Sequence, residues 1–173
     1  MATRRTSPRG IKLIQDSESF SAVIYLCPAG KPTIGYGHVV RPHDDLHPPI
    51  TPARALELLY HDLDAVEIYL GAVFPGLNQN QFDALADFCF NLGIKSFETS
   101  TLFKLLKAGK FIPASDEFQR WNKAHVNGRF VPLAGLTTRR LKERDLFLTP
   151  LIPSTVYRRD ESRPTEVPPA TDR

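Results

Sequence analysis

The hydrophobic pattern of the chain changes once, near residue 50, and that change limits the fold classes open to it. From Phe20 to Val40, β-branched and aromatic residues alternate with turn-forming glycine and proline, which predicts two or three short antiparallel strands. From Thr51 onward, apolar residues recur at helical spacing. Because the strands precede the helices instead of alternating with them, the sequence predicts an α+β fold with segregated elements and no parallel sheet of βαβ units.

Capping residues and prolines mark the helix boundaries. Ser7-Pro8 and Thr51-Pro52 each place an N-cap residue before a proline at the first helical position, and Asn78 opens a further helix. The first helix is expected to end near residues 18–19, and the helix that begins at Asn78 is expected to stop at Gly93. We expect the other helices over residues 52–70, 100–108, 113–123 and 137–147, with a loop over residues 42–49.

The composition suits one globular domain followed by a tail. The chain has 173 residues, of which 42% are hydrophobic and 24% are charged, as is ordinary for a folded domain. From residue 150 onward, prolines are dense among serine, threonine and charged residues, and such a composition buries too little apolar surface to offset the entropy lost on ordering. We therefore expect a domain over residues 1–150 and a flexible tail over residues 151–173.

No apolar run approaches the roughly 18 residues of a membrane-spanning helix, and no secretory signal is visible.

Charge and cysteine content argue against several classes of protein. The net charge of +3 is concentrated in residues 1–12, which contain no acid, and this short basic arm favours contact with an anionic surface. The rest of the predicted domain has no basic surplus, which argues against a nucleic-acid-binding protein.

Two cysteines cannot form a disulfide scaffold. His43 and His47 lie four residues apart, but the prolines around them argue against a helical zinc site, so the sequence predicts neither a metal nor a cofactor.

Three side chains between residues 18 and 33 have chemistry suited to acid–base catalysis. Glu18 ends the first predicted helix beside an apolar stretch, residues 20–24, and burial against such neighbours raises the pKa of a carboxyl group, as a general acid at neutral pH requires. Cys27 and Thr33 follow at strand or turn positions that allow all three side chains to face one cleft. The spacing alone leaves open an alternative in which Glu18 is a solvated helix-end acid, Cys27 a small core residue and Thr33 an ordinary strand residue.

A specific run of residues connects these three positions to a known family. Eight residues separate Glu18 from Cys27, five separate Cys27 from Thr33, and the run continues as Ile34-Gly35-Tyr36-Gly37-His38. This pattern resembles the phage-type lysozymes (endolysins, glycoside hydrolase family 24). Four later segments are also similar to that family, although each is less specific: residues 80–93, 100–102, 118–121 and 135–144. The resemblance extends over about residues 9–148 in consistent order.

The resemblance implies a lysozyme-like fold. In such a fold a small antiparallel sheet lobe and a larger helical lobe are joined by a long helix, here residues 52–70, with the substrate cleft between the lobes. It also implies a muramidase that hydrolyses the β-1,4 bond between N-acetylmuramic acid and N-acetylglucosamine in peptidoglycan, without a cofactor. Such an endolysin is expected to be a monomer that stays in the host cytoplasm until a separate membrane lesion lets it reach the glycan strands of the cell wall.

The same resemblance implies roles for the three candidate residues. Glu18 protonates the leaving glycosidic oxygen, and Thr33 orients the attacking water. Cys27 departs from the motif, because many relatives carry aspartate there, and a free thiol with a pKa near ~8.5 is a weaker base than aspartate. Cys27 is therefore open as a base, a nucleophile, a water-positioning group or a structural residue. The competing interpretation is a non-catalytic peptidoglycan-binding module in which Cys27 marks lost activity, and the retained Glu18 and Thr33 argue against it.

Further residues are expected near the substrate. The resemblance places Phe90 and Asn91 in the cleft, and Tyr36 and His38 are additional candidates for substrate binding. Each aromatic residue has an alternative as a packing residue. A histidine at a strand end commonly holds structure through a carboxylate or backbone partner.

The predicted long helix offers two carboxylate partners for that histidine, Asp62 and Asp64. On the last predicted helix, Arg139 and Arg140 have two interpretations. They meet the acidic peptide stems of peptidoglycan, or they belong to a solvated helix face.

Overall fold

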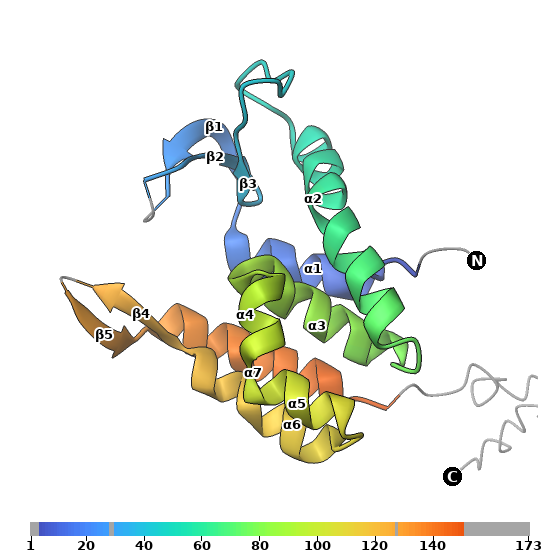
Figure 1. Ribbon diagram of the computed structural model, residues 1–173. Helices are drawn as coiled ribbons and strands as arrows, with labels where there is room; N and C mark the ends of the chain where they lie inside the picture. The colour runs from blue at the N-terminus through green and yellow to red at the C-terminus, as the bar shows by residue number, and fades with distance from the viewer. Residues whose placement is uncertain (1–3, 28–29, 127, 151–173) are drawn as a thin grey trace, which may run out of the picture.

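The computed structural model describes residues 4–27, 30–126 and 128–150, so the predicted tail, residues 151–173, lies outside the described residues. Within them the chain forms helices and short strands in mixed order (Figure 1). In chain order the elements are α1 (Pro8–Glu18), β1 (Ser21–Leu26), β2 (Pro32–Gly35), β3 (His38–Val39), α2 (Pro52–Val73), α3 (Gln79–Leu92), α4 (Ile94–Thr99), α5 (Thr101–Lys107), α6 (Phe111–Glu117), the 3-10 helix η1 (Phe118–Trp121), β4 (Lys123–Val126), β5 (Arg129–Pro132) and α7 (Ala134–Leu148).

The elements form two lobes. Strands β1, β2 and β3 pair in antiparallel order and make one lobe, while α3 to α7 make the other. Figure 1 shows α2 running from the sheet lobe into the helical lobe. The predicted architecture, an α+β fold with a small antiparallel sheet lobe and a larger helical lobe joined by a long helix, is therefore confirmed. In the part of the chain that the structure describes, no helix combines the length and apolar character needed to cross a membrane.

Helix α2 joins the lobes because its apolar face contributes to three hydrophobic cores. In order along the helix, Ala55 and Leu58 pack under the sheet, Leu59 and Leu63 pack against α1, and Val66 and Leu70 pack in the helical lobe. All six side chains are buried, and full burial of a large aliphatic side chain stabilises a fold by about 1.5–3 kcal/mol. The two lobes are thus held to one continuous helix face, which is what the helical spacing of apolar residues predicted.

The predicted helix starts are confirmed at three caps. Ser7, Thr51 and Asn78 each accept a backbone N–H with the side-chain oxygen, and Gln81 completes a capping box with Asn78. The helix over 52–70 extends to Val73. Capping is a local interaction, so it can be recognised from a few neighbouring residues.

The second half of the chain departs from the predicted order of strands before helices. The helix expected over 113–123 ends at Glu117 and continues as η1. Strands β4 and β5 then pair as an antiparallel hairpin, and Gly128, directly before β5, has a φ of +76°. Most of this hairpin is exposed; His125 and Phe130 pack across it with ring centroids 5.1 Å apart. Because few of its side chains reach the core, the hairpin lacks the regular burial pattern that reveals a strand. The short helix α4, directly after Gly93, was likewise not predicted.

The basic N-terminal arm binds the protein itself. Arg4 donates from Nη1 to the carbonyl of Leu77 at 2.5 Å, and Arg5 pairs with Asp64 and Glu67 of α2. These contacts hold the arm against α2 and against the segment between α2 and α3. They also engage two of the charges that we expected to face an anionic surface.

Helices α1 and α3 approach each other closely at Gly10. A Cβ atom at this position would lie 2.6 Å from Cγ2 of Thr6 and 2.8 Å from Cβ of the fully buried Asp83. Asp83 in turn accepts hydrogen bonds from the backbone N–H and the hydroxyl of Ser7. The absence of a side chain at Gly10 therefore allows the start of α1, and the acid at its end, to be fixed against α3.

We expect Gly10→Ala to lower the free energy of unfolding by about 1–3 kcal/mol, because overpacking forces neighbouring atoms apart. Gly71, in the interior of α2, is the matched control: an added Cβ meets nothing within 4 Å, so Gly71→Ala should stabilise the protein by about 0.5–1 kcal/mol through helix propensity. Urea unfolding measures both values. Equal effects of the two substitutions would contradict the close approach of α1 and α3.

Candidate active site

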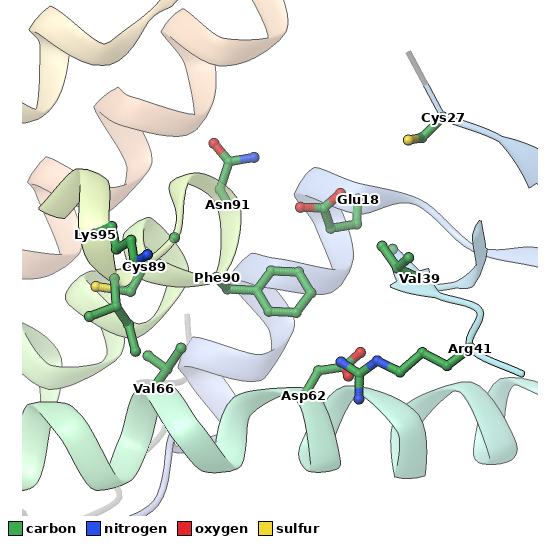
Figure 2. Close-up of a pocket in the computed structure, with 13 residues that line it drawn as sticks. Glu18, Cys27, Val39, Arg41, Asp62, Val66, Cys89, Phe90, Asn91 and Lys95 are labelled. Atoms are coloured by element: carbon green, nitrogen blue, oxygen red, sulfur yellow. The ribbon is translucent and has the colours of Figure 1, made fainter. Parts of the chain in front are cut away.

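A cleft of about 800 Å³ lies between the two lobes. Cys27 and Val39 line it from the sheet lobe, Phe90 and Asn91 line it from α3, and Glu18 stands between these two walls (Figure 2). One face of α2 also borders the cleft. Across residues 4–27, 30–126 and 128–150, no three His, Cys, Asp or Glu side chains are grouped as a metal site requires. The cleft is large enough for a ligand of several rings. Two acids line it, Glu18 and Asp62, and Asp62 is hydrogen-bonded to His38.

Glu18 is held by a cation from the last helix. Its Oε1 atom accepts a hydrogen bond from Nη1 of Arg139, and its side chain retains 22% exposure to solvent. Arg139 is itself fixed by Asp87 of α3, with Nε–Oδ2 and Nη2–Oδ1 distances of 3.1 and 2.6 Å. Burial disfavours the charged guanidinium, but the carboxylates of Asp87 and Glu18 outweigh it and raise the pKa of Arg139. Glu18 therefore has one oxygen fixed, while its second oxygen takes no part in this contact.

Two expectations about this acid and its partner were wrong. We expected residues 20–24 to bury Glu18, but Val23 and Ile24 are 55% and 45% exposed, and the partner of the carboxylate is a guanidinium. β1 lies at the edge of its sheet, so an apolar run there need not enter the core. The helix face of Arg139 and Arg140 was expected to be solvated or to meet substrate, yet both side chains are buried.

The buried cation cluster extends beyond Arg139. Arg140 donates from Nη2 to the amide oxygen of Asn91 at 3.0 Å and lies 2.6 Å from Oε1 of Glu143. Burial, together with the charge of Asp87, raises the pKa of Glu143 well above its usual range. The two guanidinium groups thus lie among the carboxyl groups of Glu18, Asp87 and Glu143. Buried ionic groups are tolerated when they are paired in this way.

The structure brings Cys27 to the cleft but buries Thr33. Cys27 is half-buried, and Figure 2 shows its sulfur on the side of the strand that faces Glu18. Thr33 lies in β2, is only 2% exposed, and donates its hydroxyl to the carbonyl of Lys31 at 3.0 Å. Thr33 is not among the residues that border the cleft.

The four candidates for substrate binding divide into two pairs. Phe90 and Asn91 line the cleft, and Figure 2 shows the phenyl ring of Phe90 directed into the space below Glu18. Tyr36 is half-buried; its ring centroid lies 5.6 Å from that of Phe20, and it packs on two of the hydrophobic cores. Tyr36 does not border the cleft, so its packing alternative agrees with the structure.

His38 is held as a structural residue. It is 2% exposed, with Nδ1 2.7 Å from Asp62 and Nε2 3.0 Å from Asp44. Asp62 is thus the partner on α2, whereas Asp64 binds Arg5 instead. The two hydrogen-bonded carboxylates raise the pKa of His38 against the opposing effect of burial. The histidine connects β3 and the following loop to α2 and leaves no ring nitrogen free for substrate.

Sequence inspection missed residues that act on Glu18 from distant parts of the chain. Asp87 and Glu143 fix the cation cluster, and nothing in their local sequence marks them. Gly37 has a φ of +87°, and a Cβ there would lie 3.3 Å from Oε2 of Glu18. The absence of a side chain at Gly37 therefore leaves room for the carboxyl group of Glu18. The glycine directly before His38 is the sequence feature from which this turn could have been recognised.

Comparison with known proteins gives one consistent result. The family model described as Phage lysozyme matches residues 15–143. The chain is 41% identical, over 143 residues, to an endolysin of Acyrthosiphon pisum secondary endosymbiont phage 1, a match that covers 82% of this chain and 96% of the relative. Among solved structures, it is similar to the muramidase domain of SpmX from Asticaccaulis excentricus, with a TM-score of 0.77, 34% identity, and coverage of 85% of this chain and 99% of that chain. It is also similar to the endolysin from Escherichia coli O157:H7 phage FAHEc1, with a TM-score of 0.76, 31% identity, and coverage of 85% and 95%.

The raised pKa of His38 predicts a pH-dependent stability. Because the folded protein binds this proton more tightly than the unfolded chain, the contribution of His38 is complete below its unfolded pKa of about 6.5 and is lost as pH rises through the folded pKa. The free energy of unfolding of wild type should therefore exceed that of His38→Asn most at mildly acidic pH, and the difference should shrink toward alkaline pH. His61→Asn, at an exposed position on α2, is the control. A difference for His38→Asn that grows with pH would contradict the assignment.

Proposed function

The chain belongs to the phage lysozyme family, and we propose that this endolysin hydrolyses peptidoglycan at the β-1,4 bond between N-acetylmuramic acid and N-acetylglucosamine. The observation that carries the proposal is the position of Glu18, a partly exposed acid centred between the two walls of a glycan-sized cleft. The similar structure from Asticaccaulis excentricus is described as a muramidase domain, which supports this choice of bond.

In the proposed reaction, Glu18 is the general acid. Arg139 fixes Oε1, so the proton is donated from Oε2, the oxygen that faces the turn at Gly37. Protonation of the glycosidic oxygen allows the bond to the anomeric carbon to break through an oxocarbenium-like transition state. Filling the cleft with substrate excludes water, which strengthens the electrostatic interactions between the protein and the reacting bond.

We assign Cys27 to the face of the sugar on which water attacks. Cys27 lines the same cleft as Glu18, and it occupies the motif position at which many relatives carry aspartate. A thiol is a weak base at neutral pH, so the role proposed here is to position the water and accept its proton late in the reaction. Thr33, buried in β2, is proposed to help orient the same water.

Substrate contacts on the helical lobe are proposed for two residues. The ring of Phe90 offers an apolar face to the sugar, and Asn91 offers an amide group whose oxygen is already held by Arg140. His38 and Tyr36 are proposed to stabilise the fold of the sheet lobe and not to contact the substrate.

The remaining proposals concern the whole protein. We propose that it is a monomer whose catalytic unit lies within residues 1–150, that the tail is dispensable for folding, and that it binds no nucleic acid. Endolysins act on the cell wall. We propose that this one stays in the host cytoplasm until a separate membrane lesion gives access to the wall.

The non-catalytic module is not favoured, because family and relatives both point to a hydrolase.

Glu18→Gln should lower the release of reducing sugar from purified peptidoglycan by at least about 10²–10⁴-fold, the usual contribution of general acid catalysis. Glu57→Gln, the same chemical change at an exposed position on α2 that lies outside the cleft, should leave the rate unchanged. Thermal unfolding verifies that both variants fold. Substantial activity in folded Glu18→Gln would remove Glu18 from the chemistry.

Cys27→Ser tests the thiol. If Cys27 accepts a proton from water, Cys27→Ser should reduce turnover about tenfold or more, and Cys27→Asp should turn over faster than Cys27→Ser, because a carboxylate is ionised at neutral pH. The measurement is kcat on soluble peptidoglycan fragments, with melting temperature as the folding control. Identical kcat values for wild type and both variants would show that Cys27 has no chemical role.

A further inference from the structure

A second hollow adjoins the cleft at Glu18. Its volume is about 350 Å³, and Glu18, Ser19, Phe20, Ser21 and Tyr25 line it. Glu18 is the one residue that borders both this hollow and the main cleft. The acid therefore stands at the junction of two binding spaces, with Phe90 in one and Tyr25 in the other.

The geometry of the sheet places Tyr25 beside the candidate catalytic residues. Tyr25 and Cys27 are two residues apart, and the backbone N–H of Cys27 bonds to the carbonyl of Lys31, so the strand pairing continues to Cys27. Residues two apart on a strand face the same side of the sheet. Tyr25 is also the direct cross-strand partner of Thr33, and side chains in that relation are neighbours on one face. The aromatic ring thus shares a sheet face with both residues.

The electrostatic surroundings of the phenol agree with this position. Burial raises the pKa of Tyr25, and the charges of Glu18 and Cys27 raise it further. The side chain still keeps 39% of its surface exposed. A ring that is close to the acid and the thiol, yet accessible from solvent, is available to a ligand that passes the acid.

The chain between α1 and β1 shapes the floor of the hollow. Ser19 has a φ of 60° and a ψ of 167°, a backbone conformation that residues other than glycine rarely adopt. It follows Glu18 directly and turns the chain so that the acid and Tyr25 border one space. Ser19 and Ser21 add hydroxyl groups beside the rings of Phe20 and Tyr25. Apolar faces with a few polar groups at their edge suit a small polar ring such as a pyranose.

We propose that this hollow, lined by residues 18–21 and Tyr25, is a pyranose-binding subsite in which the Tyr25 ring packs against the sugar that follows the scissile bond on the side away from Phe90. The inference rests on the proposed function, because a chain cleaved internally must be bound on both sides of its acid. The subsite divides the glycan at Glu18: one part is held by the helical lobe and the other by β1. Tyr25 is a binding residue in this account, and its hydroxyl takes no proton.

The test compares two substitutions of the same ring. On soluble peptidoglycan oligomers, Tyr25→Leu should raise KM about tenfold with kcat within twofold of wild type, because removing a contact made equally in ground and transition states changes only binding. Tyr25→Phe should match wild type in both constants. Ile24→Ala is the control, since Ile24 is the adjacent exposed residue and lines neither the hollow nor the main cleft.

Each outcome has a distinct meaning. An unchanged KM for Tyr25→Leu, or a KM raised equally by Ile24→Ala, would overturn the subsite. A kcat lost in Tyr25→Phe would also overturn it, because the hydroxyl would then act in the chemistry. If wild type releases no reducing sugar from any oligomer, the proposed function itself fails, whereas normal wild-type cleavage with an indifferent Tyr25→Leu variant rejects only the subsite.

Discussion

The pairing of Arg139 with two carboxylates is the interaction on which the site depends. Arg139, from α7, binds Asp87 of α3 and Glu18 at the end of α1, so one guanidinium connects three helices. Asp87 is fully buried, and removal of one partner from a buried pair costs on the order of 3–5 kcal/mol because a charge is left uncompensated. The acid is therefore positioned by the fold of the helical lobe, although it lies at the border of the sheet lobe.

The sheet lobe is held to the helical lobe by other contacts than the Arg139 ion pairs. Helix α2 shares its apolar face among three cores, and His38 connects β3 to it through Asp62. These contacts fix the turn at Gly37 against Glu18 and bring Cys27 to the opposite wall of the cleft. A single acid thus faces groups from both lobes, which is the arrangement that a glycan lying between them requires.

Local signals in the sequence predicted much of the fold, and long-range contacts were beyond them. The caps at Ser7 and Asn78 depend on neighbours within four residues, so they could be recognised directly. The pair of Arg139 and Glu18 spans 121 residues, and no single-sequence pattern reveals such a contact. The apolar stretch over residues 20–24 shows the opposite error: its hydrophobicity predicts burial around the acid, whereas Val23 and Ile24, on an edge strand, are 55% and 45% exposed.

The central claim is that Glu18 directs the hydrolysis of one type of glycosidic bond. Mass spectrometry of the soluble products from digested cell-wall sacculi tests it most directly, because the chemical form of the new chain end records the reaction. The account predicts fragments that end in reducing N-acetylmuramic acid with one water added per cut. Fragments that end in reducing N-acetylglucosamine, or in an anhydro sugar formed without water, would contradict it.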